Sequence, residues 1–239
     1  MSTIWADSDA KKNFQNVFNK ETLFALYDLA DKGHFRVLNG IVKSGKESNL
    51  CVGETRSGDL VAVKIYMIEA SNFKRMREYL IGDPRFEGIK KNKRSVVFNW
   101  CKKEYKNLKK AGKAGVDAPR PIAFKKNVLV MEYLGEGMRP APRLKDVELE
   151  NPKKGLNEII KSLETLYKKE KLVHGDASEY NIQIWNNRPY LIDFSQSVVT
   201  RHPNAEKMLE RDVENISNHF KKKYSIRKDK KDMLDQIRH

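Results

Sequence analysis

Residues 172–193 read L-V-H-G-D-A-S-E-Y-N-I-Q-I-W-N-N-R-P-Y-L-I-D. Within this stretch Asn181 follows Asp176 by five residues, and Asp193 ends a second apolar run. Residues 182–192 have the composition of two short strands joined by a turn, which predicts a hairpin. Because the hairpin would return Asp193 to the preceding loop, three oxygen-bearing side chains are expected to converge on a gap the size of one cation.

This spacing is typical of phosphoryl-transfer sites. A protein-kinase catalytic loop carries an Asp that accepts the proton of the attacking hydroxyl, then an Asn five residues later that binds a metal ion, and a later strand supplies a second Asp to the metal. By this pattern we predict that Asp176 is catalytic and that Asn181 and Asp193 bind the metal.

A lysine that could bind nucleotide phosphates precedes this stretch. Residues 60–66, L-V-A-V-K-I-Y, are predicted to form a strand that follows another at 50–54 across a turn. Alternation along the strand places Lys64 on the same face as Ala62, where a flat base could lie. A lone Lys in a strand is usually a solvent-facing charge, but V-A-V-K matches the kinase strand whose Lys contacts the phosphates.

Such a lysine needs a carboxylate partner, and residues 95–110 supply one on a predicted helix. One stripe of this helix carries Val97, Cys101, Glu104 and Leu108 at spacings of four, three and four. Because a carboxylate on an apolar stripe is costly to bury without a cation, we predict that Glu104 pairs with Lys64. The alternative is a rim Glu104 that pairs with Lys103 or Lys110 on its own helix.

Two further segments are candidates for binding ATP. The loop G-I-V-K-S-G-K-E at 40–47 lacks the final Ser or Thr of a P-loop and precedes a strand, so that motif is rejected. Its Ser, Gly and Lys residues could still cover phosphates from above. The run at 128–135 is a buried strand that leads into a glycine, where a kinase hinge would present backbone groups to adenine.

The net charge of +15 is concentrated in two segments. Residues 82–113 carry eleven Lys or Arg against three acidic residues, and residues 220–239 carry eight against three. This distribution favours a phosphate-rich partner, although a solvated surface is the simpler alternative. No run is long and apolar enough for a membrane span, so we expect a cytoplasmic protein. Cys51 and Cys101 lack metal-ligand spacing, and we expect no function for them.

Taken together, the motifs resemble those of the RIO family of atypical serine protein kinases, over about residues 34–220. The segments that carry the resemblance are S-G-K-E-S (44–48), V-A-V-K-I-Y (61–66), G-D-P-R-F (82–86), H-G-D-A-S-E-Y-N (174–181), I-D-F-S-Q-S-V (192–198) and H-P-N-A (202–205). They are more similar to the subfamily with an S-x-G-K-E phosphate loop than to the one with an N-terminal winged helix.

The resemblance implies an α+β, bilobal protein-kinase-like fold, with an antiparallel N-lobe sheet and a mainly helical C-lobe. We expect a helical extension at 1–33, an N-lobe at 34–131 with a mobile insertion at 82–95, and a hinge and C-lobe at 132–239 that ends in a basic helix.

The sequence departs from ordinary protein kinases in three places. Gly175 replaces the Arg of H-R-D, and Ser195 stands where D-F-G has its glycine. Only about ten residues separate Asp193 from the next helical run, and no A-P-E motif follows. No activation-loop region is therefore expected.

The resemblance also implies ATP with Mg²⁺ or Mn²⁺ as cofactors and a role in maturation of the small ribosomal subunit, on particles of rRNA and ribosomal proteins. The expected ATP-binding residues are Ser44, Gly45, Lys46, Glu47, Ser48, Ala62, Lys64, Glu104, Met131, Glu132, Leu134 and Ile192. Asp193 is expected to be a phospho-acceptor as well as a metal ligand, which would make the cycle an ATP hydrolysis through an aspartyl-phosphate. Serine phosphorylation, including autophosphorylation, stays open, and we expect a monomer.

Two alternative functions are kept. Small-molecule phosphotransferases of the aminoglycoside and choline kinase type share H-G-D-x-x-x-x-N, but they need a large helical lobe, whereas forty-six residues follow Asp193 here. A non-catalytic RNA-binding assembly factor would not need Lys64, Glu104, Asp176, Asn181 and Asp193 together.

Overall fold

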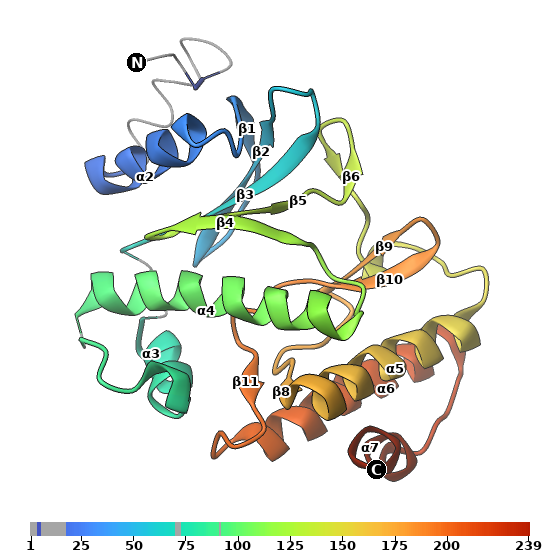
Figure 1. Ribbon diagram of the computed structural model, residues 1–239. Helices are drawn as coiled ribbons and strands as arrows, with labels where there is room; N and C mark the ends of the chain where they lie inside the picture. The colour runs from blue at the N-terminus through green and yellow to red at the C-terminus, as the bar shows by residue number, and fades with distance from the viewer. Residues whose placement is uncertain (1–3, 6–17, 70–72, 91) are drawn as a thin grey trace. The chain divides into compact units, whose positions relative to one another are not determined.

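The chain forms two compact units that interleave along the sequence (Figure 1). The computed structural model describes residues 4–5, 18–69, 73–90 and 92–239. Unit 1 comprises residues 1–80, 88–105 and 120–140, and unit 2 comprises residues 81–87, 106–119 and 141–239. The predicted lobes, 34–131 and 132–239, are continuous in sequence. In the structure, residues 81–87 and 106–119 belong to unit 2, and unit 1 extends to residue 140.

Unit 1 is built on a five-stranded antiparallel sheet with the strand order β1-β2-β3-β5-β4. The strands are β1 (Val37–Ser44), β2 (Ser48–Glu54), β3 (Leu60–Tyr66), β4 (Pro121–Lys125) and β5 (Val128–Glu132). A two-stranded ribbon, β6 (Gly135–Glu136) with β7 (Arg139–Pro140), follows β5. The predicted strands are confirmed, although the strand expected at 128–135 ends at Glu132.

The two faces of β3 have different surroundings. Val61, Val63 and Ile65 are buried in one cluster with Leu26 and Leu29 of α2 (Lys20–Asp31), the helix that covers the sheet in Figure 1. Asn19 caps α2 by accepting a hydrogen bond from the Thr22 N–H, and Gly33 follows its end with a φ of 80°. This helix is as predicted, whereas residues 1–3 and 6–17 of the expected extension lie outside the described residues.

The opposite face of β3 carries Ala62, Lys64 and Tyr66, all buried. Ala62 packs with Val52 and Tyr133, and the partly buried Val42, Leu50, Leu60 and Met131 surround them. The long helix α4 (Lys93–Ala114) begins in unit 1 and continues into unit 2. Helix α3 (Phe73–Ile81) precedes it.

The segment predicted to be a mobile insertion is partly buried. Asp83 and Phe86 are 0% and 4% exposed around the short helix η1 (Pro84–Phe86). A Cβ atom at Gly82 would come within 2.2 Å of His202 Nε2, so the missing side chain lets the imidazole pack against the backbone. The predicted mobility of residues 82–95 stays a prediction, and Lys91 lies outside the described residues.

Unit 2 is mainly helical, with α5 (Pro152–Glu170), α6 (Ala205–Tyr224) and α7 (Lys230–Arg238) packed together (Figure 1). The predicted hairpin is confirmed as β9 (Ile182–Trp185) paired with β10 (Arg188–Leu191). Strand β8 (Leu172–Val173) pairs with β11 (Val198–Val199), and η2 (Leu144–Asp146) precedes α5. Residues 200–204 alone join β11 to α6, which leaves no room for an extended activation segment. Among the described residues, no helix is long and apolar enough to cross a membrane.

Candidate active site

The loop before β9 brings Asp176 and Asn181 together in unit 2. The Asn181 side-chain amide donates to the Asp176 carboxylate at 2.8 Å and to its backbone carbonyl at 2.9 Å. The Asn181 N–H donates to the Ser178 carbonyl at 2.9 Å, which closes the loop between them. Both hydrogens of the Asn181 amide are thereby used, so its Oδ1 is the atom suited to a metal ion.

Asp193 is returned to the same loop by the hairpin. The N–H of Ile192 donates to the Asn181 carbonyl at 3.0 Å, so the residue before Asp193 is bonded to the predicted metal ligand. Asp193 itself has a φ of 63°, a left-handed conformation that Asp adopts at some cost. The hairpin therefore brings Asp193 back to the loop of Asp176 and Asn181, as predicted.

Ser195 and Gln196 hold the carboxylates of Asp193 and Asp176, and sequence reasoning missed this role. The Ser195 hydroxyl donates to Asp193 Oδ1 at 2.7 Å, and the Gln196 amide donates to Asp176 Oδ2 at 3.0 Å. In sequence, Ser195 is recognisable only as a replacement for the glycine of D-F-G. The signal was the pair of hydrogen-bonding side chains in I-D-F-S-Q, but its targets depend on the tertiary fold.

Helix α6 anchors the backbone of the catalytic loop. Asp212, fully buried, accepts hydrogen bonds from the N–H groups of Gly175 at 2.7 Å and Ala177 at 2.8 Å. Arg211 donates to the Gly175 carbonyl, and Asn215 donates to the Ala177 carbonyl at 3.2 Å. Burial raises the pKa of Asp212 to about 7, although the two N–H donors act in the other direction. Sequence reasoning missed Asp212, because it lies thirty-six residues after Asp176.

The backbone conformation of residue 175 favours glycine. Its φ is 79°, and a Cβ atom there would lie 3.0 Å from the Gln196 carbonyl oxygen. In sequence, Gly175 is notable only because ordinary protein kinases have an arginine at this position. The structure shows that a side chain here would press against the segment that carries Gln196.

His174 joins the catalytic loop to the strand that ends at Asp193. Its Nε2 donates to the Ile192 carbonyl at 3.2 Å, and its Nδ1 accepts from the Asp176 N–H at 3.4 Å. Burial lowers its pKa to about 4, with the nearby Asp193 carboxylate opposing this shift. The imidazole is therefore neutral at physiological pH, which this pair of bonds requires.

A second network supports the segment after Asp193. Asn107 donates to the carbonyls of Phe194 and Ser197, both at 2.9 Å. Its own side-chain oxygen accepts from Arg85 at 2.8 Å, and Arg85 is paired with Asp83 at 2.6 Å. The G-D-P-R motif thus supports the segment next to Asp193 through one helical asparagine.

In unit 1 the predicted ion pair of Lys64 and Glu104 is present. Lys64 Nζ lies 2.8 Å from Glu104 Oε1, and the two side chains are 9% and 1% exposed. The Tyr66 hydroxyl donates to the other Glu104 oxygen. Val97, Cys101 and Leu108 are buried as predicted, so the alternative of a rim Glu104 is wrong.

Seven of the other predicted ATP-binding residues of unit 1 fall into two groups. Ser44, Gly45, Lys46, Glu47 and Ser48 form a tight turn between β1 and β2, in which the Gly45 N–H donates to the Ser48 carbonyl at 3.0 Å. Ala62 and Met131 belong to an apolar cluster that could receive a flat base, and sequence reasoning missed its members Val42, Leu50 and Val52.

At the expected hinge, the roles of Glu132 and Leu134 towards adenine stay a prediction. The Glu132 N–H donates to the Arg120 carbonyl at 2.8 Å, so it is already used within the sheet. Leu134 is buried. The remaining predicted ATP-binding residue, Ile192, is half-buried in unit 2.

The donor set fits a hard divalent cation. Mg²⁺ is typically bound through one or two carboxylates with phosphate oxygens and water. Asp193 offers a carboxylate, and Asn181 offers an amide oxygen whose nitrogen is turned towards Asp176. Cys51 and Cys101 are both buried and form no disulfide.

Comparisons with known proteins show the family of this chain. The family model for the RIO domain matches residues 49–233. The RIO-type serine/threonine-protein kinase Rio1 of Haloferax volcanii is 45% identical over 218 residues, which cover 90% of this chain and 74% of the relative. Its namesake from Methanocaldococcus jannaschii is 42% identical over 213 residues, covering 89% and 72%.

Among solved structures, the complex of Chaetomium thermophilum Rio2 kinase with ADP, Mg²⁺ and phosphoaspartate superposes with a TM-score of 0.70. It is 21% identical, and the match covers 93% of this chain and 68% of that one. This likeness shows a bilobal, kinase-like fold.

Proposed function

The chain belongs to the RIO family of serine/threonine-protein kinases, and from this premise we propose that Asp176, Asn181 and Asp193 carry out phosphoryl transfer from ATP. Kinase chemistry and a general use of ATP with a divalent metal follow from the family. The roles of individual residues are the proposal. The observation that carries it is that the Asn181 amide holds the Asp176 carboxylate, while the backbone N–H of Ile192, the residue before Asp193, donates to the Asn181 carbonyl.

In unit 1, Lys64 is proposed to bind nucleotide phosphates, with Glu104 as its partner. An ion pair with both members buried holds the ammonium in one place, which suits it to bind a phosphate oxygen instead of moving in solvent. Ala62 and Met131 would receive the base, and the turn at residues 44–48 would cover the phosphates. Tyr66 keeps Glu104 oriented by its hydroxyl.

Asn181 and Asp193 would hold Mg²⁺ or Mn²⁺, which would neutralise charge on the phosphates. Asp176 accepts the proton of the attacking serine hydroxyl or water. Its carboxylate is held by Asn181 and Gln196, so its position does not depend on a substrate.

Asp193 is proposed to accept phosphate during the cycle. Its carboxylate oxygen would attack the γ-phosphorus, the bond to the β-phosphate oxygen would break, and ADP would leave. Water, losing its proton to Asp176, would then hydrolyse the acyl phosphate and restore the carboxylate. Support comes from the phosphoaspartate in the Chaetomium Rio2 complex and from the Ser195 bond that fixes one Asp193 oxygen.

The proposed setting is maturation of the small ribosomal subunit, with pre-ribosomal particles as the partner. The net charge of +15 supports a partner rich in phosphate. Family membership sets aside the small-molecule phosphotransferase alternative.

The test is incubation with ATP labelled at the γ-phosphate, with and without purified pre-small-subunit particles. We expect particle-stimulated phosphate release and a protein-bound label that hydroxylamine removes. The label should be absent in Asp193→Asn and present in the matched control Asp146→Asn, an exposed aspartate of η2. A label confined to hydroxylamine-stable serine phosphate would refute the aspartyl-phosphate. Phosphate release that the particles do not stimulate would refute the ribosomal role.

A further inference from the structure

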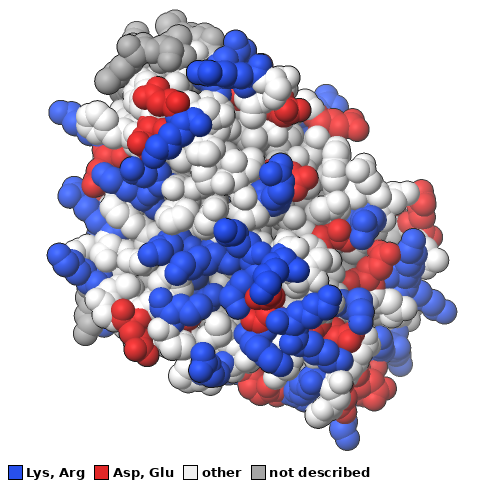
Figure 2. All heavy atoms as spheres, in the orientation of Figure 1, with Lys and Arg blue, Asp and Glu red and all other residues white. Residues whose placement is uncertain are grey.

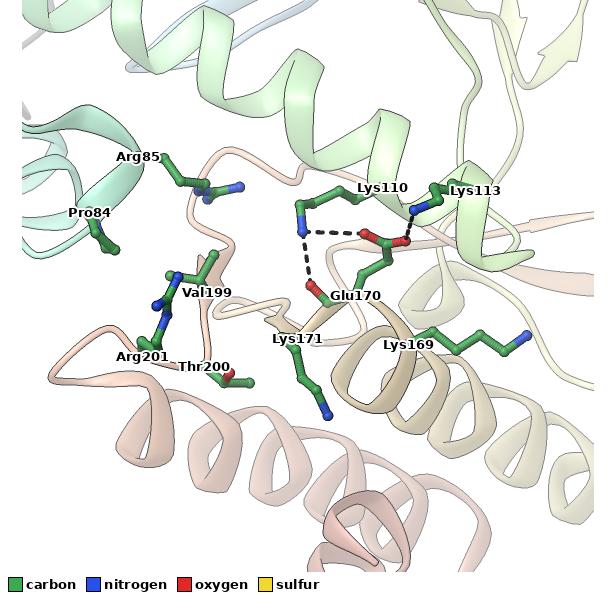
Figure 3. Close-up of a pocket in the computed structure, with 10 residues that line it drawn as sticks. All are labelled: Pro84, Arg85, Lys110, Lys113, Lys169, Glu170, Lys171, Val199, Thr200 and Arg201. Atoms are coloured by element: carbon green, nitrogen blue, oxygen red, sulfur yellow. Dashed lines mark hydrogen bonds and ion pairs between the residues drawn. The ribbon is translucent and has the colours of Figure 1, made fainter.

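A cavity of about 630 Å³ lies in unit 2 and is called the basic pocket (Figure 3); its lining residues do not include Asp176, Asn181 or Asp193. It is lined by η1, the last turn of α4, the end of α5 and the residues after β11, namely Pro84, Arg85, Lys110, Lys113, Lys169, Glu170, Lys171, Val199, Thr200 and Arg201. Its volume is in the usual range for ligand sites, about 300–1,000 Å³. Six of the ten side chains are cationic, whereas ordinary ligand pockets are mainly apolar.

The cations of the basic pocket outnumber its one carboxylate. Glu170 lies 3.3 Å from both Lys110 and Lys113, so its charge is shared between them (Figure 3). In the part of the chain that the structure describes, no carboxylate is within ion-pair distance of Lys169, Lys171 or Arg201. The pocket therefore has a local excess of positive charge.

Some of the cations of the basic pocket neutralise the partial negative charge at two helix C-termini. Helices α4 and α5 both end here, and the carbonyl groups of a helix C-terminus repel an anion. Lys110 donates to the Glu170 carbonyl at 2.9 Å, and Lys169 donates to the Ala114 carbonyl at 3.3 Å. Lys171 and Arg201, both exposed, are then the cations left to meet an anion from outside.

The frame of the basic pocket is held in place. Lys171 ends α5 in a left-handed conformation, with its N–H donating to the Leu166 carbonyl. The Thr200 N–H donates to the Lys171 carbonyl at 2.8 Å, which ties Lys171 and Arg201 to one backbone junction. Arg85 is fixed by Asp83 on the opposite wall. Such preorganisation lowers the entropy cost of binding.

The positive charge continues beyond the basic pocket along α4. Lys106, Lys109 and Lys113 are exposed at spacings of three and four, which places them on one face of the helix, the α4 lysine row. Figure 2 shows Lys and Arg gathered over this half of α4 and the end of α5. The row extends about 10 Å at 1.5 Å per residue, so it is longer than a single phosphate group. An extended phosphate chain matches this row better than a single small anion.

We infer that the basic pocket and the α4 lysine row bind the sugar-phosphate backbone of RNA, with Lys171 and Arg201 contacting phosphates. This inference rests on the proposed ribosomal role for the identity of the RNA. Backbone contacts of this kind would position the protein without reading the base sequence.

The test compares two charge-neutralising double variants. Lys171→Asn with Arg201→Gln removes the two cations assigned to phosphate contacts, and Asn tolerates the left-handed backbone at residue 171. Lys221→Gln with Lys222→Gln removes the same charge from the exposed last turn of α6. Arg85 is left unchanged because it supports Asn107. Binding of a small-subunit rRNA fragment is measured by filter retention over a range of salt, with polyglutamate and pyrophosphate as competitors.

The pocket variant should bind RNA about tenfold more weakly, with a salt slope shallower by about one for each phosphate that is no longer neutralised. The α6 variant should bind nearly as the unchanged protein does, and ATP turnover without RNA should be unaffected in both. Equal weakening in the two variants, or an unchanged slope in the pocket variant, would overturn the inference. So would polyglutamate or pyrophosphate competing as well as RNA does at equal charge. Absence of ATP turnover in the unchanged protein would refute the proposed function alone.

Discussion

The Gln196 side-chain amide donates a 3.0 Å hydrogen bond to the Asp176 carboxylate, and this bond links the segment after Asp193 to the catalytic loop. Ser195, the neighbouring residue, bonds to Asp193 itself. Adjacent side chains therefore fix the two aspartates relative to each other within unit 2. Neither Ser195 nor Gln196 needs to touch the nucleotide to affect turnover.

Gln196→Ala should lower kcat by about tenfold to a hundredfold, because Asp176 would lose one of its positioning bonds. The KM for ATP should change little, since the proposed metal ligands are untouched. Steady-state phosphate release checks this split, with Gln183→Ala on β9 as the control. An equal change in kcat and KM, or no change in either, would contradict a positioning role.

Lys64 and Glu104 should behave as one unit. Replacing either with Ala leaves a buried charge without its partner, which costs about 3–5 kcal/mol and should reduce turnover severely. The double variant should then be little worse than either single variant. Kinetics of the complete double-mutant cycle, with unfolding curves for each protein, provide the measurement. Fully multiplicative losses would mean that the pair does not act together.

Asp212→Asn should displace the catalytic loop from α6. An amide nitrogen would face one of the two N–H donors, Gly175 or Ala177, so that bond becomes a repulsive contact. We expect a loss of stability of about 1–3 kcal/mol and a fall in kcat larger than any change in ATP affinity. Asn215→Ala, which removes one weaker bond to the same loop, is the matched control and should have a smaller effect. Unchanged kcat in a folded Asp212→Asn protein would refute the anchoring role.

His174 should make the protein sensitive to acid. Its pKa is about 4 in the folded chain and 6.5 as the ordinary value, so between these values the unfolded chain binds a proton that the folded chain does not. The contribution of His174 to the free energy of unfolding is therefore fully present above pH 6.5. It falls as the pH falls, by about 2 kcal/mol at pH 5. The gap in unfolding free energy between the unchanged protein and His174→Gln should narrow from pH 7.5 to pH 5. A gap independent of pH would show that His174 does not titrate in this way.

Much of the fold could be predicted from local sequence pattern. The apolar stripe of α4 located Glu104 on an inward face, and the alternation of β3 located Lys64, so their pair followed from the cost of burying a lone charge. The five-residue spacing of Asp176 and Asn181, with the hairpin after them, likewise predicted that the chain before Asp193 returns to their loop. These are short-range or strongly periodic signals.

The supporting residues could not be predicted, because their roles depend on tertiary contacts. Asp212 lies on a helix whose periodicity says nothing about the loop that it anchors, and Asn107 is one polar position among many on α4. At Gly175 the sequence shows only a missing arginine, since the conflict of a side chain with the Gln196 carbonyl arises in three dimensions. The basic pocket is similarly assembled from four segments that are each merely basic in sequence.

The central claim is that Asp176 and Asp193 have different tasks in one phosphoryl-transfer site, and ATP turnover measured beside ATP affinity tests it most directly. Asp176→Asn and Asp193→Asn should each lower phosphate release by at least about a hundredfold. In the presence of Mg²⁺, calorimetry should show that ATP binding is weakened by Asp193→Asn and nearly intact in Asp176→Asn. Near-normal release by either variant, or the same ATP affinity in both, would contradict the account.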